Sequence, residues 1–308
     1  MYQQVYQYLH RHGLLHPDHH GFLQNHSTAT ALQQLVDTWL RAADAGKLSA
    51  TILLDLRAGF DVINHEILID KLKEYNFGET TLSWFRSYLM GRHQCVQIES
   101  SFSPFLSVPW GIPQGSILGP LLFLIYVNEL PEVVKEADIA GESTDGDDDD
   151  TKEDETSIVV FADDNSTTTS HKEPEVLQQK IQAKGAKVIE WFKTNEITCS
   201  GGKTKLLFTG TKNNRQNRIE NRNITPKINL GDEIIKESSS EKVLGVTVNN
   251  IITWSNHLYG DHENEGLIPG LSKRLGMLIK LRKFMTNQKF SKIVEGIFTS
   301  KLIYGMNL

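Results

Sequence analysis

Two apolar, β-prone segments that each end in carboxylates constrain the fold of this chain more than any other feature. The first is residues 53–55 (LLD), and the second is residues 158–164 (IVVFADD). A buried strand that ends in acidic residues places negative charge at the edge of a core. If Asp55, Asp163 and Asp164 meet there, their repulsion raises their pKa values unless a cation lies between them. The sequence therefore predicts a divalent-metal site, which is typical of phosphoryl chemistry.

Each carboxylate also has a simpler explanation when it is taken alone. Asp55 at the end of a strand is equally compatible with a helix cap or a ribose contact. The pair Asp163 and Asp164, followed by Asn165, is typical of a solvated hairpin turn. The order of the segments favours the catalytic interpretation. A glycine-rich loop at residues 111–116, which opens the apolar helix predicted at 120–127, lies between the two strands.

Composition is compatible with a soluble intracellular protein. The chain has 308 residues, of which 39% are hydrophobic, and two cysteines, which argues against a disulfide scaffold. The first residues lack the basic and apolar regions of a signal peptide, and no apolar segment approaches the length of a membrane span. We therefore expect no secretion, no membrane association, and a location in the cytoplasm, the nucleus or both.

The negative charge of the chain is concentrated in one segment. Residues 132–157 contain 12 acidic and 2 basic residues, a local net charge of −10, which leaves +4 for the rest of a chain whose total is −6. A mildly basic body with one acidic insert is compatible with a partner that carries a phosphate backbone. Residues 138–157 have almost no apolar side chains, so we expect this insert to be disordered.

The hydrophobic pattern predicts an α+β fold in which strands and helices alternate irregularly. We expect a capped helix that begins after Ser27 or Thr28. Further helices are predicted over residues 65–75, 82–89, 120–127 and 177–192, and from Leu267 onward. Strands are predicted at 51–56, 95–98, 105–108, 158–162, 205–208 and 243–248, and a polar surface loop at 211–227.

Five histidines near the beginning of the chain invite a metal-site interpretation. They are His10, His12, His16, His19 and His20. Their spacing matches no zinc-binding pattern, so we expect these side chains to be solvated.

The chain resembles the reverse transcriptase domain of non-LTR (LINE-like) retrotransposons, over most of its length. Residues 110–123 (WGIPQGSILGPLLF) resemble the family's substrate-binding motif, and this match is the most specific. Residues 55–61 (DLRAGFD) resemble its first carboxylate motif, and residues 161–164 (FADD) resemble its catalytic hairpin. Residues 244–246 (LGV), with Trp254 and His257, resemble its primer grip.

This resemblance implies a two-metal nucleotidyl transfer from a dNTP to the 3′-hydroxyl of a primer. Asp55 and Asp163 would hold two Mg²⁺ (or Mn²⁺) ions, and Asp164 would support the site. One ion lowers the pKa of the primer hydroxyl, and the other neutralises the triphosphate and the leaving pyrophosphate. Lys203 or Lys205 would act as the general acid toward pyrophosphate. The implied partners are an RNA template, a DNA primer and a dNTP.

The resemblance also assigns substrate contacts. Phe60 would be the steric gate that excludes a ribose 2′-hydroxyl, and the alternative for Phe60 is an ordinary core aromatic. Gln114 and Gly115 would let the backbone approach the incoming nucleotide and the template, and the alternative is a plain tight turn. His65 is expected to pack or to cap a helix rather than to ligate a metal.

The family's fold is the palm of a right-hand polymerase, an antiparallel sheet with packed helices. We expect residues 1–50 to be a truncated fingers region, 51–257 the palm and 258–308 a partial thumb. Leu23 and Gln24 lie where the family has a basic residue near the triphosphate, and Gly59 is unusual before the gate. A decayed or truncated fragment that binds nucleic acid without useful polymerisation therefore remains an alternative to an active polymerase. A different two-metal nucleotidyl enzyme is disfavoured by the glycine-rich loop.

Overall fold

The computed structural model describes residues 1–308 except 57, 140–155, 200, 232, 262–264 and 305–308. Most of the acidic insert predicted at 138–157 therefore lies outside the described residues. Its predicted limits are too wide at both ends. Helix α6 (Leu130–Ile139) includes residues 138 and 139, and strand β6 (Ser157–Phe161) begins at residue 157.

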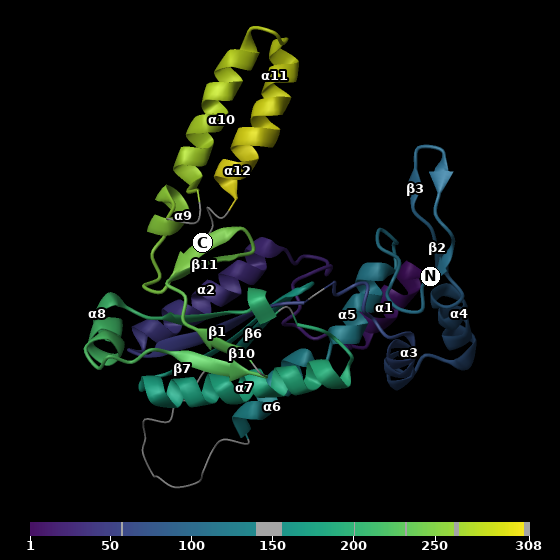
Figure 1. Cartoon of the computed structure of the whole chain (residues 1–308), viewed down its shortest axis with the longest axis horizontal. Helices are drawn as coiled ribbons and strands as arrows, with labels where there is room; N and C mark the ends of the chain where they lie inside the picture. The colour runs from purple at the N-terminus through teal and green to yellow at the C-terminus, as the bar shows by residue number, and fades with distance from the viewer. Residues whose placement is uncertain (57, 140–155, 200, 232, 262–264, 305–308) are drawn as a thin grey trace.

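A four-stranded antiparallel sheet forms the centre of the molecule (Figure 1). Its strands, in spatial order, are β6, β7 (Asp164–His171), β1 (Leu48–Asp55) and β8 (Lys205–Thr209). Every neighbouring pair is antiparallel, and helices cover both faces. The predicted α+β class is confirmed. Strand β1 is longer than predicted, because it begins at residue 48 rather than 51.

Side-chain alternation along β1 divides the core into two clusters. Ala50, Ile52 and Leu54 join the larger cluster, which includes residues of α7 (Pro174–Thr194). Thr51 points the other way, toward α2 (Thr28–Asp44), where its hydroxyl accepts a hydrogen bond from Trp39 Nε1 at 2.8 Å. Because residues i and i+2 of a strand share a face, this alternation fixes which side of the sheet each helix can cover.

The remaining elements agree largely with the sequence pattern. Ser27 is the N-cap of α2, as predicted, and forms a capping box with Thr30. The other helices of the body are α1 (Tyr2–Arg11), α3 (His65–Glu74), α4 (Glu79–Leu89), α5 (Gly119–Val127), η1 (Gly201–Lys203) and α9 (Ser255–Tyr259). The short strands include β9 (Lys227–Leu230) and β10 (Glu233–Lys236), which pair with each other.

Three predicted elements have a different form. The hairpin predicted at 95–108 is split into β2 (His93–Gln94) with β5 (Leu106–Ser107), and β3 (Gln97–Ile98) with β4 (Ser101–Phe102). The single strand predicted at 243–248 is two strands, β11 (Ser240–Val243) and β12 (Val246–Asn249), which turn at residues 244 and 245. The loop predicted at 211–227 contains α8 (Lys212–Arg215) and a π-helical turn, η2 (Gln216–Glu220). It is anchored by buried Arg215, whose guanidinium pairs with Glu237 at 2.8 Å.

The prediction that the five N-terminal histidines are solvated holds for His10 and His12, which are exposed, but is wrong for His19 and His20. Asp18 and His20 exchange backbone hydrogen bonds with Val160 on the free edge of β6, at 3.0 and 2.8 Å. His19 is fully buried and His20 nearly so. The prediction failed because pairing between residues 18–20 and residue 160 is a long-range event that the local sequence does not encode.

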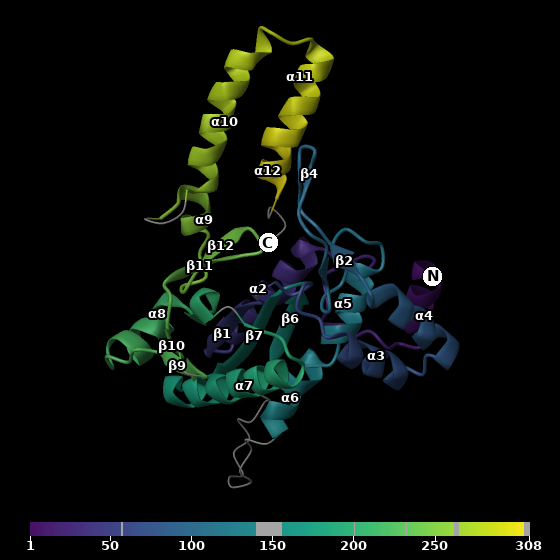
Figure 2. The same cartoon turned by 45° about the vertical axis from the view of Figure 1, so that its right-hand side comes forward.

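A helical arm rises from the sheet at the C-terminal end (Figures 1 and 2). It consists of α10 (Leu267–Arg282), α11 (Asn287–Val294), a π-helical turn η3 (Glu295–Thr299) and α12 (Ser300–Ile303). The arm is tied back to the β11–β12 turn by Tyr304, whose hydroxyl donates a hydrogen bond to the Leu244 carbonyl. Within the described part of the chain, no helix is both long and apolar enough to cross a membrane.

Burial of His19 makes the stability of the fold depend on pH. Desolvation, with a smaller contribution from His16, lowers the pKa of His19 from 6.5 to about 4. The unfolded chain therefore binds a proton below pH 6.5 that the folded chain does not bind until about pH 4. The contribution of neutral, buried His19 to the free energy of unfolding is fully present above pH 6.5. It falls by roughly 3 kcal/mol as the pH is lowered toward 4.

We expect this loss to shrink in His19→Leu, which cannot titrate. The free energy of unfolding in urea, measured at pH 7.5, 6 and 5 for both proteins, checks the prediction. Equal pH dependence in the two proteins would contradict it, and His10→Leu, at an exposed position, is the matched control.

Candidate functional site

The predicted carboxylates converge at one end of the sheet. In the β1–β7 register, Asp55 lies directly opposite Asp164. The Leu56 amide donates a hydrogen bond to the Asp163 carbonyl at 3.3 Å, so Asp163 also lies beside the end of β1. The hairpin turn is at Ala162 and Asp163, one position earlier than the predicted turn, because Asp164 and Asn165 are already paired in β7.

The three carboxylates interact electrostatically. The pKa of Asp164 is raised to about 6, mainly by desolvation and then by the negative charges of Asp163 and Asp55, against the opposing charge of Lys203. The sequence predicts that repulsion raises the pKa values of all three carboxyl groups. The structure shows a raised pKa for Asp164, with burial as its larger cause and repulsion as the smaller one. Among the described residues, Lys203 is the one cation that forms an ion pair with these carboxylates.

Lys203 makes direct contact with this cluster. Its Nζ lies 3.2 Å from Asp55 Oδ2 and 3.5 Å from Oδ1. Both Lys203 and Lys205 line a cavity of about 340 Å³ together with Asp55 and Asp164. The structure thus places both candidate general acids at the carboxylates, and only Lys203 pairs with one of them.

The donor set at this cavity suits a hard divalent cation. Carboxylate oxygens are the ligands that Mg²⁺ prefers, and burial, followed by the charges of Asp163 and Asp55, raises the pKa of Asp164. Within the described residues, however, no three His, Cys, Asp or Glu side chains are arranged closely enough to hold an ion. The ion pair between Lys203 and Asp55 occupies one of the carboxylates that would have to turn toward a metal.

Phe60 lies between two other aromatic rings. Its ring stacks on Phe123 at 4.7 Å and meets Phe22 edge-on at 5.9 Å. Phe60 is half-buried against the main core and is not part of the lining of the carboxylate cavity. Gly59 is explained by the same packing, because a Cβ at Gly59 would lie 3.2 Å from the Phe123 ring.

Gln114 is held by a residue that sequence reasoning did not single out. Its Nε2 donates to both carboxylate oxygens of Asp61, at 2.9 and 3.0 Å, and its amide oxygen accepts no hydrogen bond from the residues that the structure describes. The two loops are also joined through the backbone, because the Ile112 amide donates to the Phe60 carbonyl at 2.8 Å. Gly111 is required there, since its φ is +79° and a Cβ would lie 2.7 Å from the Asp61 carbonyl oxygen.

The structure also places Gly115 and His65, the two other residues singled out in this region of the sequence. Gly115 has a φ of +76° and nothing near its Cβ position, so it provides an open turn. His65 does not approach the carboxylates. It is buried, and its Nε2 lies 2.8 Å from the Gly111 carbonyl oxygen, which agrees with the expected packing role.

The turn at Ala162 and Asp163 is also held from the N-terminal side. Gly21 follows the segment that pairs with β6, and a Cβ on Gly21 would lie 2.7 Å from the Ala162 backbone nitrogen. Ala162 itself has a φ of +56°. The close contact between residues 21 and 162 was missed, and the only sequence signal for it is the glycine.

Comparisons with known proteins agree with this geometry. A family model described as "Reverse transcriptase (RNA-dependent DNA polymerase)" matches residues 1–248. The chain is 35% identical over 116 residues to the "Probable RNA-directed DNA polymerase from transposon BS" of Drosophila melanogaster. It is also 35% identical over 117 residues to that from transposon X-element of the same species. These matches cover 37% and 38% of this chain and 13% of each relative, so the chain spans a small part of their length.

Solved structures show the same fold at low sequence identity. Apo telomerase from Candida tropicalis, truncated from its C-terminal domain, matches with a TM-score of 0.51 and 16% identity. The match covers 81% of this chain and 43% of that one. Apo telomerase of the same species matches with a TM-score of 0.50 and 14% identity, over 82% and 40% of the two chains. At this identity the likeness supports the fold alone, and the predicted palm-like α+β fold is confirmed.

We expect Gly21→Ala to destabilise the protein by about 1–3 kcal/mol, because the added methyl group forces the backbone of residues 21 and 162 apart. Urea unfolding of the variant and the wild type measures the difference. Gly276→Ala is the control, since no atom lies near its Cβ position and alanine favours the α10 helix by up to ~1 kcal/mol. Unchanged stability of Gly21→Ala would show that the close contact relaxes without cost.

Proposed function

We propose, since the chain belongs to the reverse transcriptase (RNA-dependent DNA polymerase) family, that its carboxylate cavity catalyses RNA-directed DNA synthesis. The predicted likeness to the reverse transcriptase domains of non-LTR retroelements is confirmed by the matched transposon polymerases. The proposed reaction transfers a nucleotidyl group from a dNTP to a primer 3′-hydroxyl, with an RNA template and a DNA primer as partners. An intracellular location is part of the same proposal.

The observation that carries this proposal is the pairing of Asp55 with Asp164 at the end of β1, with Asp163 in the adjoining turn. Two acidic strand ends that are more than a hundred residues apart in sequence meet at one cavity. Such a cluster is unfavourable without a catalytic or metal-binding role, because like charges repel one another and burial opposes the ionisation of Asp164. We infer that Asp55 and Asp163 hold the metal ions and that Asp164 supports them.

When bound, two Mg²⁺ or Mn²⁺ ions would supply charge neutralisation at the attacking hydroxyl and the leaving pyrophosphate. The protein's own contribution begins with the release of Asp55 from Lys203, which frees both the carboxylate and the ammonium group. Lys203 is then positioned at the cavity as a proton donor toward the leaving group. Lys205 lines the same cavity but has no described ion pair with the carboxylates, so Lys203 is the stronger candidate.

Phe60 and Gln114 are proposed to contact the incoming nucleotide. The Phe60 ring is fixed between Phe22 and Phe123, and such a rigid ring could exclude a ribose 2′-hydroxyl by its volume. Asp61 holds the amide nitrogen of Gln114, so the free amide oxygen would accept a hydrogen bond from a sugar hydroxyl. Gly115 would let the backbone approach the nucleotide and the template, because its φ of +76° leaves no side chain in the way.

The same proposal assigns the regions of the chain. Residues 1–50 correspond to the fingers, residues 51–257 to the palm and residues 258–308 to the thumb. The helical arm of α10 to α12 supports the last assignment, because it stands apart from the sheet on the side of the β11–β12 hairpin (Figure 2).

Extension of oligo(dT) on poly(rA) with Mg²⁺ or Mn²⁺ tests the activity and the mechanism together. Asp163→Asn should lower extension at least about 100-fold, a loss of ~2.7 kcal/mol of transition-state stabilisation. Asp37→Asn, an exposed position on α2, is the matched control and should leave the rate unchanged. Extension that survives Asp163→Asn would refute the mechanism. Binding of primer–template without any extension by the wild type would favour the decayed or truncated fragment.

Sugar selection tests the gate separately. Phe60→Ala should raise the ratio of rNTP to dNTP incorporation by roughly tenfold, whereas Phe60→Tyr keeps the ring and should leave the ratio near that of the wild type. Thermal unfolding is measured for both variants, because Phe60 also packs on Phe123. An unchanged ratio in a folded, active Phe60→Ala would show that Phe60 is only a core residue.

A further inference from the structure

Residues 55–61 contain a second aspartate, Asp61, which is not among the residues that line the carboxylate cavity. Its two carboxylate oxygens lie 2.9 and 3.0 Å from the amide nitrogen of Gln114. Among the described residues, Gln114 is the one side chain that hydrogen-bonds to this carboxylate, and no cation pairs with it. The function of Asp61 is therefore to be sought in what it does to Gln114.

The two loops that carry Asp61 and Gln114 are already held together by their backbones. The Ile112 amide donates a hydrogen bond to the Phe60 carbonyl at 2.8 Å. Gly111 packs directly on the neighbouring loop, because a Cβ at Gly111 would lie 2.8 Å from the Asp61 Cα. The pair of side chains is exposed to water, which competes for its hydrogen bonds, so it adds little to stability. The Asp61–Gln114 pair is therefore not needed to join the loops.

The carboxylate of Asp61 decides which end of the Gln114 amide points toward it. An ionised carboxylate only accepts hydrogen bonds, whereas a glutamine side chain has one donor end and one acceptor end. The donor end must face Asp61, so the amide oxygen is turned away from the carboxylate. Because that oxygen accepts no hydrogen bond from the described residues, it is available to a donor on a ligand.

The aromatic ring that precedes Asp61 in the sequence is held by different contacts. Phe60 stacks on Phe123 at 4.7 Å and meets Phe22 edge-on at 5.9 Å. Neither contact involves the Asp61 side chain, so the position of the ring does not depend on the Asp61–Gln114 pair. This region of the chain therefore presents two independent features, a fixed apolar ring and an oriented hydrogen-bond acceptor.

We propose that Asp61 is a positioning residue, which holds Gln114 so that its amide oxygen accepts a hydrogen bond from the 3′-hydroxyl of the incoming nucleotide. This inference rests on the proposed function. A dNTP has a single sugar hydroxyl, at the 3′ position, and its ionised phosphates offer only acceptors. Donors on the base differ from one nucleotide to the next, whereas the 3′-hydroxyl is common to all four. Phe60 then selects at the 2′ position by volume, and the Asp61–Gln114 pair selects at the 3′ position by hydrogen bonding.

Competition between nucleotides tests the role of Asp61. Incorporation of dTTP, ddTTP and ribothymidine triphosphate is compared on poly(rA)/oligo(dT), because ddTTP differs from dTTP only by the 3′-hydroxyl. Asp61→Ala should lower the preference for dTTP over ddTTP by roughly five- to tenfold, the effect of one hydrogen bond. The preference for dTTP over the ribonucleotide and the Tm should both stay near those of the wild type. Asp70→Ala, which removes a carboxylate at an exposed position of α3, is the control and should change none of these quantities.

An exchange of the two side-chain types tests the same contact from the other partner. Gln114→Glu sets two carboxylates against each other, and their repulsion removes the fixed orientation. In Asp61→Asn/Gln114→Glu, the new amide donates to the new carboxylate, whose second oxygen can still accept a hydrogen bond from the sugar. We expect this double variant to recover several-fold of the dTTP preference that Gln114→Glu loses. A double variant that is no better than Gln114→Glu would contradict the proposal.

Nucleotide binding without chemistry separates this inference from the proposed function. A primer that ends in a dideoxynucleotide cannot be extended, so the Kd values of dTTP and ddTTP are measured for the protein with this primer on poly(rA) and Mg²⁺. Tighter binding of dTTP that Asp61→Ala abolishes, in a protein that extends no primer, would support the role of Asp61 and refute the polymerase.

Three results would overturn the role of Asp61. The first is primer extension by Asp61→Ala with an unchanged preference for dTTP over ddTTP, which would leave the proposed function intact. The second is an equal loss of selection at the 2′ and 3′ positions, which would indicate a general disturbance of the loop. The third is that neither nucleotide binds to the wild type, since Gln114 would then have no sugar to contact.

Discussion

The antiparallel register between β1 and β7 is the constraint on which the rest of the site depends. It sets Asp55 opposite Asp164, and a slip of one residue would turn every side chain of β1 to the other face of the sheet. The register is fixed away from the carboxylates, where Ile52 and Leu54 enter one core and Thr51 meets Trp39 in the other. The apolar strand therefore stabilises a charge arrangement that is unfavourable in itself.

The turn at Ala162 and Asp163 is held from outside the sheet as well. Residues 18–20 complete the edge of β6, and Gly21 then lies against the backbone of Ala162. On the other side, the loops at 60–63 and 111–112 are joined by backbone hydrogen bonds, and Gly111 permits their close approach. Glycines thus mark the points where separate segments meet at the site, because a side chain there would push the backbones apart.

The sequence predicted what depends on local pattern and chemistry. The α+β class, the Ser27 cap, and the meeting of Asp55 with the acidic hairpin follow from hydrophobic periodicity, capping preference and strand ends. What it missed depends on long-range pairing. His19 and His20 look polar and solvated until residue 160 pairs with them. Arg215 looks like part of a surface loop, because its partner Glu237 is distant in sequence.

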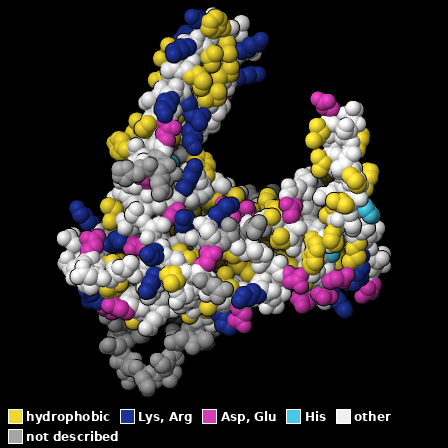
Figure 3. Space-filling view, in the orientation of Figure 1, with side chains coloured by type: hydrophobic (Ala, Val, Ile, Leu, Met, Phe, Trp, Pro, Cys, Tyr) yellow, Lys and Arg dark blue, Asp and Glu magenta, His cyan; other side chains and the backbone are white. Residues whose placement is uncertain are grey.

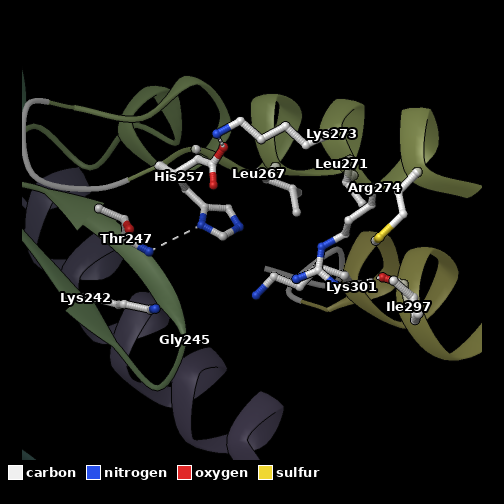
Figure 4. A pocket seen from close by; sticks show the side chains of 14 residues that line it. Lys242, Gly245, Thr247, His257, Leu267, Leu271, Lys273, Arg274, Ile297 and Lys301 are labelled. Carbon is white, nitrogen blue, oxygen red and sulfur yellow. Dashed lines mark hydrogen bonds and ion pairs between the residues drawn. The ribbon is translucent and has the colours of Figure 1, made fainter.

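Charge is distributed unevenly across the β11–β12 hairpin. One side faces the carboxylate cavity, where burial raises the pKa of Asp164, and the other faces a cavity at the base of the helical arm, where burial, followed by the charges of Lys301 and Lys242, lowers the pKa of His257 (Figure 4). Lys and Arg side chains gather along the arm and at its base (Figure 3). Three basic side chains, those of Lys203, Lys205 and Lys242, also line the carboxylate cavity, beside Asp55, Asp164 and Glu241. Because Lys242 of the hairpin lines both cavities, its charge acts in each of them, within the ~8–10 Å over which charges interact in physiological salt.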